Sequence, residues 1–347
     1  MTPSKKIKLL YSKKQINSAW ISLIKDNLSE NEMKENLLIL NNWRTAHDYP
    51  MNTFQSLLRS KIKSLQYSAV VVERLKRTHS IIGKLKRNPN MMLSRIQDIG
   101  GLRVVLENID EVYKLRDALL KGRFLHELVK EDDYIRKPKD SWYRSLHMVY
   151  KYQNSYVSEY NGLQIEIQIR TELQHIRATA VETVGIILQK ALKAWEGTQE
   201  WLDFFALTSS LFAIKEGCVP TRKYQWKDLE SLKKTLKALE KKLHVIDKLR
   251  TYSDAIKQID TNLGKRYEHY LLILNLQDHT IKVLWFKSWE INKATELYLQ
   301  QEQLFKTEDE GQVVLVAGES LKTLSHAYPN YFGDTAKFIS LLQDIVA

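Results

Sequence analysis

At the centre of the chain lies the polar stretch Asp133-Tyr-Ile-Arg-Lys-Pro-Lys-Asp-Ser-Trp-Tyr-Arg-Ser-Leu-His147. An apolar run precedes it, from Ile99 to Leu106, and another follows it, from Leu163 to Ile169. The first has the composition of a buried strand, and the second alternates apolar and polar residues with the period of two that is typical of strands. We therefore expect two strands of one sheet with a polar loop between them in the sequence.

Each expected strand carries an acidic residue, Asp98 at the start of the first and Glu166 inside the second. A carboxylate in a strand pattern is costly to bury unless it is paired or bound to a metal ion, so it indicates function more strongly than a surface acid does. Basic residues accompany both acids in the sequence: Arg103, Arg136, Lys137, Lys139, Arg144, His147 and Arg170. Two carboxylates ringed by cations suit a magnesium ion that carries a polyphosphate.

Upstream of these residues we expect one basic helix from Ser68 to Arg87. Its cations would lie along one side, where they could reach a single elongated anion. The alternative interpretation is a solvated charged face.

Four ordered motifs between about Gln66 and Gly217 resemble the synthetase domain of RelA/SpoT proteins. They are Arg74-Leu-Lys76 with Ser80-Ile-Ile-x-Lys84-x-x-Arg87, Asp98-Ile-Gly-Gly-Leu-Arg103, Tyr134-Ile-x-x-Pro138-Lys139-x-x-x-Tyr143-Arg-Ser-Leu-His147, and Glu166-Ile-Gln-Ile-Arg-Thr171. The resemblance implies an α+β fold, in which a mixed, nucleotidyltransferase-like sheet has flanking helices. It also implies a pyrophosphokinase that transfers the β,γ-pyrophosphate of ATP to a ribose hydroxyl.

The resemblance assigns a role to each motif. Asp98 and Glu166 would hold Mg²⁺, and Glu166 would also activate the attacking hydroxyl. ATP would be bound by Arg74, Lys76, Lys84, Arg87 and Arg103. Of these, Arg74 and Arg103 would stack on adenine, because planar guanidinium groups stack on bases. The acceptor would meet Tyr143, as a stacking surface for its base, together with Lys139, Arg144, His147, Gln168, Arg170 and His175.

One position departs from the family pattern. The residue before Tyr143 is usually glycine in this family, whereas here it is Trp142. Glycine suggests a backbone conformation that a bulky residue resists. Either the loop is reshaped, or Trp142 adds a second stacking surface for the acceptor.

The whole chain of 347 residues, 44% of them hydrophobic, can bury a sizeable core and is expected to hold two domains. Its net charge of +12 divides into −3 on residues 264–347 and +15 on the rest. This asymmetry suggests a nucleic-acid or polyphosphate partner for the basic part and an internal partner for the acidic part. A Lys-rich protein without such partners is the alternative.

Other features limit the class of protein. A single cysteine, Cys218, excludes an internal disulfide and a Cys-based zinc finger. No signal peptide is recognisable, and no apolar run approaches the roughly 20 residues that span a bilayer. We expect a soluble, cytoplasmic protein without a membrane partner.

We expect four segments along the chain. Residues 1–65 form a helical segment with a break at Pro50, in which His47 is structural or faces RNA. Residues 66–220 form the synthetase-like domain. Residues 221–262 form a helical linker, whose apolar stripe from Leu229 to Leu249 suits either one long bracing helix or a coiled-coil dimer seam.

Residues 263–347 form the fourth segment, the C-terminal module. We predict a ββαβα arrangement, with a hairpin at 270–286, a helix at 289–305, a strand at 313–317 and helices at 320–327 and 334–345. The module resembles the zinc-finger-like domain of fused RelA/SpoT toxin–antitoxin proteins, the CapRel group, here without metal ligands. Tyr328 and Tyr331 match the motif with which that domain plugs the ATP pocket. Two core aromatic residues are the alternative interpretation.

The acceptor divides the functional alternatives. The 3′ CCA end of tRNA would make the protein a translation-blocking toxin, and GDP or GTP would make it an alarmone synthetase. The basic charge, the altered loop and the antitoxin-like module favour tRNA. The resemblance further implies a phage structural protein, such as a capsid protein, as activator. A catalytically dead RNA-binding module is a third possibility, which the presence of both acids disfavours.

Overall fold

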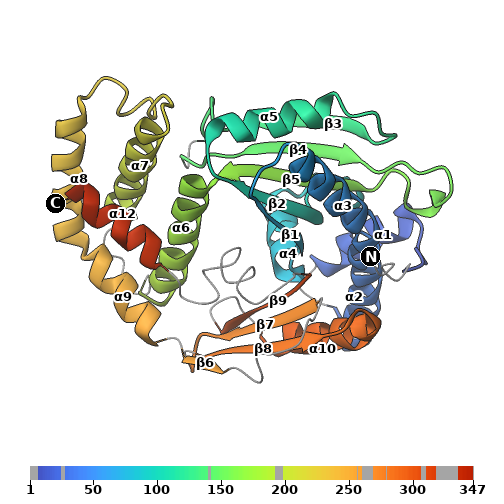
Figure 1. Ribbon diagram of the computed structural model, residues 1–347. Helices are drawn as coiled ribbons and strands as arrows, with labels where there is room; N and C mark the ends of the chain where they lie inside the picture. Colours follow the sequence, from blue (N-terminus) through green and yellow to red (C-terminus); the bar gives the residue numbers. More distant parts are fainter. Residues whose placement is uncertain are drawn as a thin grey trace.

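The computed structural model describes residues 7–24, 28–139, 142–191, 198–255, 257–259, 269–278, 280–305, 310–317 and 335–346. Two β-sheets lie one above the other, and a cluster of helices stands beside them (Figure 1). Within the described residues, no helix is both long enough and apolar enough to span a membrane.

The first sheet has the strand order β1 (Val70–Leu75), β2 (Gly100–Leu106), β5 (Gln164–Thr171), β4 (Leu146–Lys151) and β3 (Glu127–Asp133). Strands β2 and β5 are parallel, and the other neighbours are antiparallel. Helices α3 (Asp48–Ser64) and α5 (Ile109–Leu120) pack on this sheet. The expected mixed sheet of an α+β fold is confirmed.

The expected basic helix over 68–87 is wrong in its first half. Residues Val70–Leu75 form strand β1, and only Thr78–Arg87 form a helix, α4. The segment begins with three consecutive valines, whose branched side chains favour a strand. Strand β1 then pairs with β2, so Arg74 projects from a sheet and not from a helix.

The N-terminal segment is helical, as expected, with α1 (Lys13–Leu23) and α2 (Glu30–Thr45) before α3. Ser12 and Ser29 each begin a helix with a capping box. Pro50 does not break a helix, because it lies in the first turn of α3, where no intrahelical partner awaits its missing N–H. His47 is buried before α3 and contacts Trp43, so its role is structural.

The helical cluster consists of α6 (Glu172–Ala191), α7 (Thr198–Lys215), α8 (Leu229–Leu243), α9 (Val245–Ala255) and α12 (Ala336–Val346). Neither expectation for the apolar stripe is correct. The stripe is divided between α8 and α9 at His244, which has a left-handed φ of +51°. Its members Leu232, Leu236 and Leu249 are fully buried within the chain, so the stripe is not exposed as a dimer seam.

The second sheet has the order β6 (Lys257–Ile259), β8 (Thr280–Phe286), β7 (His269–Asn275) and β9 (Gly311–Ala317). The predicted hairpin, helix α10 (Ile291–Leu304) and strand β9 are confirmed. The last predicted helix, α12, packs against α6, α8 and α9. It therefore belongs to the helical cluster and not to the module. The helix predicted at 320–327 lies outside the described residues. Single 3₁₀ turns cover Leu93–Arg95, Ser158–Tyr160 and Ser288–Glu290.

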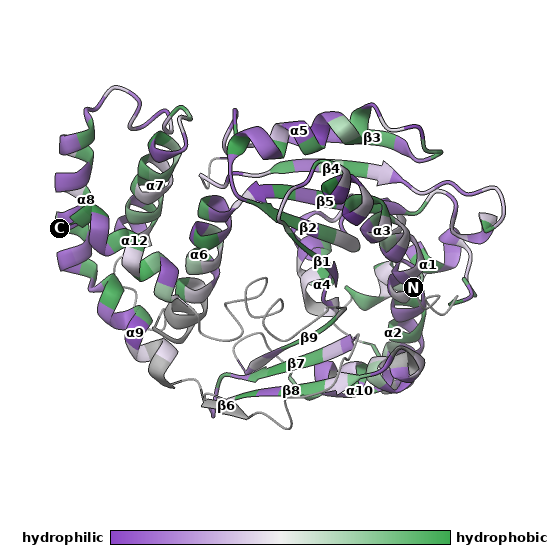
Figure 2. Cartoon of the chain, in the orientation of Figure 1, coloured by the Kyte–Doolittle hydropathy of each residue, from purple (hydrophilic) through white to green (hydrophobic). Residues whose placement is uncertain are grey.

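Both faces of the second sheet are covered. On β7, Leu272 and Leu274 point into a cluster that contains Val72 of β1, whereas Leu271 and Ile273 point into a cluster with α10. Strands β7 and β9 are accordingly apolar along most of their length (Figure 2). The C-terminal module thus packs directly on the first strand of the synthetase-like sheet.

Candidate active site

The register of three strands brings the predicted site residues together. Arg74 of β1 is opposite Gly101 of β2, which is opposite Glu166 of β5. One step further along, Arg103 of β2 is opposite Gln168 of β5. Because residues at alternate positions of a strand point to the same face, these side chains emerge on one side of the sheet.

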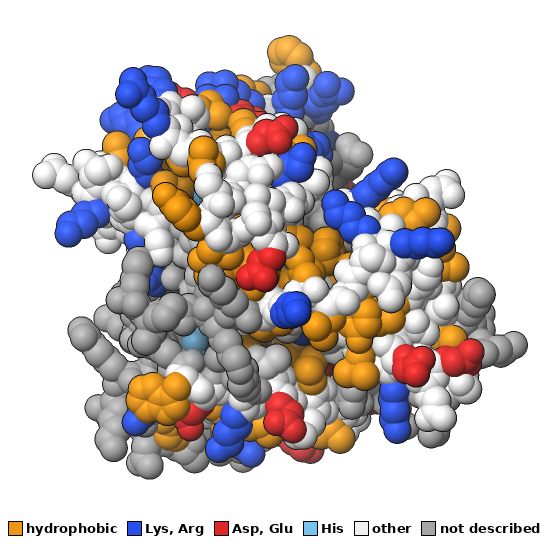
Figure 3. Space-filling model, turned by 90° about the vertical axis from the view of Figure 1, so that its right-hand side faces the viewer, with side chains coloured by type: hydrophobic (Ala, Val, Ile, Leu, Met, Phe, Trp, Pro, Cys, Tyr) orange, Lys and Arg blue, Asp and Glu red, His pale blue; other side chains and the backbone are white. Residues whose placement is uncertain are grey.

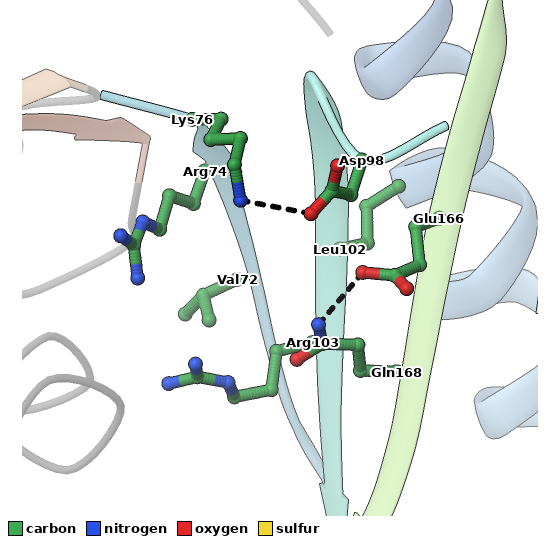
Figure 4. Close-up of a pocket in the computed structure, with 9 residues that line it drawn as sticks. Val72, Arg74, Lys76, Asp98, Leu102, Arg103, Glu166 and Gln168 are labelled. Carbon is green, nitrogen blue, oxygen red and sulfur yellow. Dashed lines mark hydrogen bonds and ion pairs between the residues drawn. The ribbon is translucent and has the colours of Figure 1, made fainter. Parts of the chain in front are cut away.

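They line a cavity of about 120 Å³ whose walls are Val72, Arg74, Lys76, Asp98, Gly101, Leu102, Arg103, Glu166 and Gln168 (Figure 4). Gly101 lies in the row between Arg74 and Glu166. Because glycine has no side chain, the space above it stays open. A Cβ atom at Gly101 would lie 3.6 Å from the backbone oxygen of Glu166, which is an ordinary van der Waals distance. We therefore infer that glycine at this position leaves space in the cavity, and not that it relieves backbone strain.

Asp98 is held between two of the predicted ATP-binding lysines. The Nζ atoms of Lys76 and Lys84 each lie 2.8 Å from one of its carboxylate oxygens. Burial by itself would raise the pKa of Asp98, but the two ammonium groups outweigh burial and hold the pKa below its usual value. The carboxylate is therefore ionised at neutral pH and ready to bind a cation.

The arginines point elsewhere. Figure 4 shows the side chains of Arg74 and Arg103 extending side by side, away from the two carboxylates. Strand β1, from which Arg74 projects, carries Val72 into contact with the C-terminal module. The arrangement separates a carboxylate end of the cavity from a guanidinium end.

The two acids suit a magnesium ion that is shared with a substrate. No group of three or more His, Cys, Asp or Glu side chains in the described residues could enclose a metal ion. Mg²⁺ commonly takes one or two carboxylates from a protein and its other ligands from phosphate and water. Asp98 and Glu166 face the same cavity and provide that number of carboxylates.

Tyr143 and His147 connect the acceptor loop to Glu166. The Tyr143 hydroxyl lies 3.1 Å from Nε2 of His147, and Nδ1 of His147 lies 2.8 Å from Oε1 of Glu166. Gln168 donates to the other oxygen of Glu166 over 2.7 Å. Burial favours a higher pKa for Glu166, but the contacts from His147 and Gln168 prevail and lower it. Sequence reasoning placed His147 with the acceptor and missed its contact with Glu166.

Trp142 keeps the backbone conformation that glycine would favour. Its φ is +58°, in the left-handed region, so the loop retains a glycine-like turn despite the bulky side chain. The indole packs against the helical cluster, and the Trp142 carbonyl accepts a hydrogen bond from Ser209 of α7 over 2.8 Å. These contacts anchor the loop to α7 and to the helical cluster, and they offset the cost of the left-handed backbone conformation at Trp142.

The other predicted acceptor residues fall into two groups. Lys139 lies over the rings of Tyr134 and Tyr143, at 4.2 and 5.5 Å from the ring centroids, so it is at the loop surface. Arg144 is buried and donates to the carbonyls of Ile135 and Val219 over 2.7 Å each, which holds the loop in place.

Arg170 and His175 are buried side by side, in hydrogen-bond contact. Burial and the nearby Arg103 lower the pKa of Arg170 to about 9. Arg177 of α6, which sequence reasoning missed, is also buried, and burial lowers its pKa to about 10. The only sequence signal for Arg177 is a basic residue on a helix that is otherwise apolar on that side.

One predicted ATP-binding residue lies away from the cavity. Arg87 is exposed in the last turn of α4, with no described contact to the cavity wall. Tyr328 and Tyr331, the predicted autoinhibitory pair, lie outside the described residues.

Comparison with known proteins places the similarity on this part of the chain. Residues 73–184 match the family model described as "Region found in RelA / SpoT proteins". The chain is 35% identical over 111 residues to the GTP pyrophosphokinase YjbM of Bacillus subtilis, which covers 31% of this chain and 52% of that protein. It is 28% identical over 148 residues to a GTP pyrophosphokinase of Escherichia coli, an alignment that covers 43% of this chain and 19% of that protein. The chain thus spans about half the length of the Bacillus relative.

The chain also aligns in part with solved structures. A GTP pyrophosphokinase family protein from Streptococcus pneumoniae aligns with a TM-score of 0.43 at 25% identity, covering 50% of this chain and 89% of that one. The small alarmone synthetase 1 of Bacillus subtilis, bound to its product pppGpp, aligns with a TM-score of 0.41 at 23% identity. This alignment covers 54% of this chain and 94% of that one.

Proposed function

Residues 73–184 carry a RelA/SpoT-like region, and from that premise we propose that the chain is an ATP-dependent pyrophosphokinase. One observation carries the proposal: Asp98 and Glu166 face a single cavity together with Lys76, Arg74 and Arg103. Transfer of a phosphoryl-type group depends on positioning and charge neutralisation more than on covalent chemistry from the protein, and this cavity provides both.

The residues divide the reaction among them. Asp98 and Glu166 would hold Mg²⁺, which neutralises the charge of the transferred group. Lys76 and Lys84, which pair with Asp98 in the free protein, would turn to the phosphates once ATP is bound. Arg74 and Arg103 would stack on adenine.

Glu166 would accept the proton of a ribose hydroxyl while the oxygen of that hydroxyl attacks the β-phosphorus of ATP. The bond from that phosphorus to the α,β-bridging oxygen breaks, AMP leaves, and the pyrophosphoryl group stays on the acceptor. The lowered pKa of Glu166 keeps its carboxylate ready to accept the proton at neutral pH.

As acceptor we propose the 3′ CCA end of tRNA. The excess of +15 on residues 1–263 supports a polyanionic partner. On the face shown in Figure 3, Lys and Arg side chains gather along the upper edge, where the synthetase-like domain lies. GDP or GTP is the second candidate, and it is favoured by the similarity to proteins named as GTP pyrophosphokinases.

Incubation with ATP labelled on the γ-phosphate would test both acceptors. We expect label on the 3′-terminal adenosine of tRNA, and none on tRNA whose terminal ribose has been oxidised with periodate. Glu166→Gln serves as the inactive control. Label in a guanosine nucleotide alone would make the protein an alarmone synthetase, and label in no acceptor would refute the pyrophosphokinase itself.

We further propose that the C-terminal module restrains the enzyme until a trigger binds, and that the trigger is a phage structural protein such as a capsid protein, as the resemblance implies. The packing of β7 and β9 on Val72, next to Arg74, supports a module that acts on the adenine end of the cavity. The plug by Tyr328 and Tyr331 belongs to this proposal. Equal ATP affinity of the intact protein and a variant with both tyrosines replaced by alanine, with unchanged growth inhibition in cells, would leave the plug unsupported.

A further inference from the structure

A continuous line of polar contacts runs from the acceptor loop to the catalytic acid. Tyr143 Oη lies 3.1 Å from His147 Nε2, and His147 Nδ1 lies 2.8 Å from Glu166 Oε1. The His147 side chain is only 8% exposed, so water competes little for either ring nitrogen. Each of the three groups therefore has the next one as its natural partner.

The imidazole is also held in place by its neighbours. His147 is on β4, opposite Gln168 of β5, so the backbone sets its position relative to Glu166. The rings of Tyr134 and Tyr143 meet it edge to face, with centroids 5.2 and 5.6 Å away. Such contacts fix the orientation of a ring as well as its place.

The chemistry of the three groups determines which atom donates. An ionised carboxylate only accepts, so the His147 nitrogen beside Glu166 must carry a proton. The other ring nitrogen, Nε2, meets the Tyr143 hydroxyl, which can donate a hydrogen bond to it or accept one from it. One oxygen of Glu166 thus accepts a hydrogen bond from His147, and the other accepts one from Gln168. The two bonds together fix the plane of the carboxylate.

We propose that His147 is a positioning residue that couples Tyr143, the stacking surface for the acceptor, to the orientation of Glu166. A base that stacks on Tyr143 would restrict its ring, and the hydroxyl would hold the imidazole and through it the carboxylate that removes the ribose proton. The inference depends on the proposed pyrophosphokinase function, but it does not depend on which acceptor is used.

Four variants separate the links. Tyr143→Phe keeps the stacking ring and removes only the hydroxyl. His147→Asn retains an N–H near the position of Nδ1 and loses the acceptor for Tyr143. His147→Leu loses both contacts. Tyr152→Phe removes the hydroxyl of a buried tyrosine whose ring packs against Tyr49 and His126, and is the control.

The kinetic expectation follows from hydrogen-bond energies. Tyr143→Phe and His147→Asn should lower kcat by about five- to tenfold, and His147→Leu by about tenfold to a hundredfold, because it also loses the bond to a charged group. The KM for the acceptor should change less than about twofold, since none of these variants removes the stacking ring. Tyr152→Phe should behave like the unmodified protein.

The state of the ring can be measured without turnover. In protein labelled with ¹⁵N-histidine, we expect a proton on Nδ1 of His147 and a change of the Nε2 shift in Tyr143→Phe. A ring protonated on Nε2 alone would overturn the inference, as would a variant series in which KM rises while kcat holds. If the unmodified protein transfers pyrophosphate to no acceptor, the proposed function fails instead, so the two failures are distinct.

Discussion

Replacing Glu302 with leucine should destabilise the protein strongly, because this residue joins the C-terminal module to the synthetase-like domain through a buried charge. Its carboxylate lies 3.1 Å from Nη1 of Arg44 on α2, with side-chain exposures of 9% and 1%. The Glu302 carboxylate also accepts hydrogen bonds from the backbone N–H of Thr78 over 2.8 Å and from the Thr78 hydroxyl over 3.0 Å. Thr78 is the first residue of α4, so Glu302 caps the helix that carries Lys84.

The magnitude follows from the burial of the pair. Removing one partner of a buried ion pair costs about 3–5 kcal/mol, because the other charge stays buried without compensation. Of its described contacts, Arg44 would keep the Thr78 hydroxyl and Tyr298, whose ring centroid is 4.6 Å from the guanidinium carbon. We expect a loss of about 3 kcal/mol or more in the free energy of unfolding for Glu302→Leu, and a comparable loss for Arg44→Met.

Urea denaturation of a double-mutant cycle would measure this. The Arg44→Met/Glu302→Leu variant should be more stable than the sum of the two single losses predicts, by about 2 kcal/mol or more, because neither charge is then left unpaired. Glu296→Gln, at an exposed position of α10, is the matched control and should stay within about 0.5 kcal/mol of the unmodified protein. A loss below about 1 kcal/mol for Glu302→Leu, or strictly additive single losses, would refute this account of the interface.

Three further predictions concern the synthetase-like domain. Glu166→Gln or Asp98→Asn should abolish pyrophosphate transfer while circular dichroism remains unchanged, and full transfer with either substitution would remove the two-carboxylate assignment. Tyr143→Ala should weaken acceptor use by about 1–3 kcal/mol, the value of one stacked base, with ATP affinity unchanged. A fall in ATP affinity with acceptor use intact would place Tyr143 on the donor side. Burial raises the pKa of Glu73 to about 8. The folded protein therefore keeps a proton on Glu73 that the unfolded chain releases near pH 4.5. The free energy of unfolding consequently falls as the pH rises from about 4.5 to 8. Glu73→Gln should remove that decline and gain stability relative to the unmodified protein, by about 3 kcal/mol at pH 7; urea midpoints that differ equally at pH 5 and pH 8 would contradict the raised pKa.

Much of the site was predictable because its residues stand in strand patterns and ordered motifs. Asp98, Arg103 and Glu166 line one cavity, as their motifs indicated. Of the basic residues in 68–87, Arg74 and Lys76 line the cavity and Arg87 does not. The predicted secondary structure of this segment was wrong, because the charge spacing was weighted above the three valines that begin β1. Trp142 shows the same limit: the sequence marked an unusual residue, and only its contact with α7 explains how the left-handed backbone is kept.

The apolar stripe of 229–249 illustrates a second limit. Its periodicity predicted an amphipathic helix, and helices are present at α8 and α9. Periodicity does not reveal what covers the apolar face, because any apolar surface satisfies it equally. Here the cover is α6, α7 and α12, the last of them more than 80 positions along the chain from the end of α9.

By itself, then, the sequence indicated the mixed sheet, the pair of acids and the cations around them, since strand periodicity and the order of the motifs can be recognised without the fold. Tertiary structure alone decided which charges pair. Lys76 and Lys84 meet on Asp98, His147 meets Glu166, and Arg44 meets Glu302 across 258 positions of sequence. Those contacts depend on strand register and on the docking of one module on another, and neither is encoded in the spacing of nearby residues.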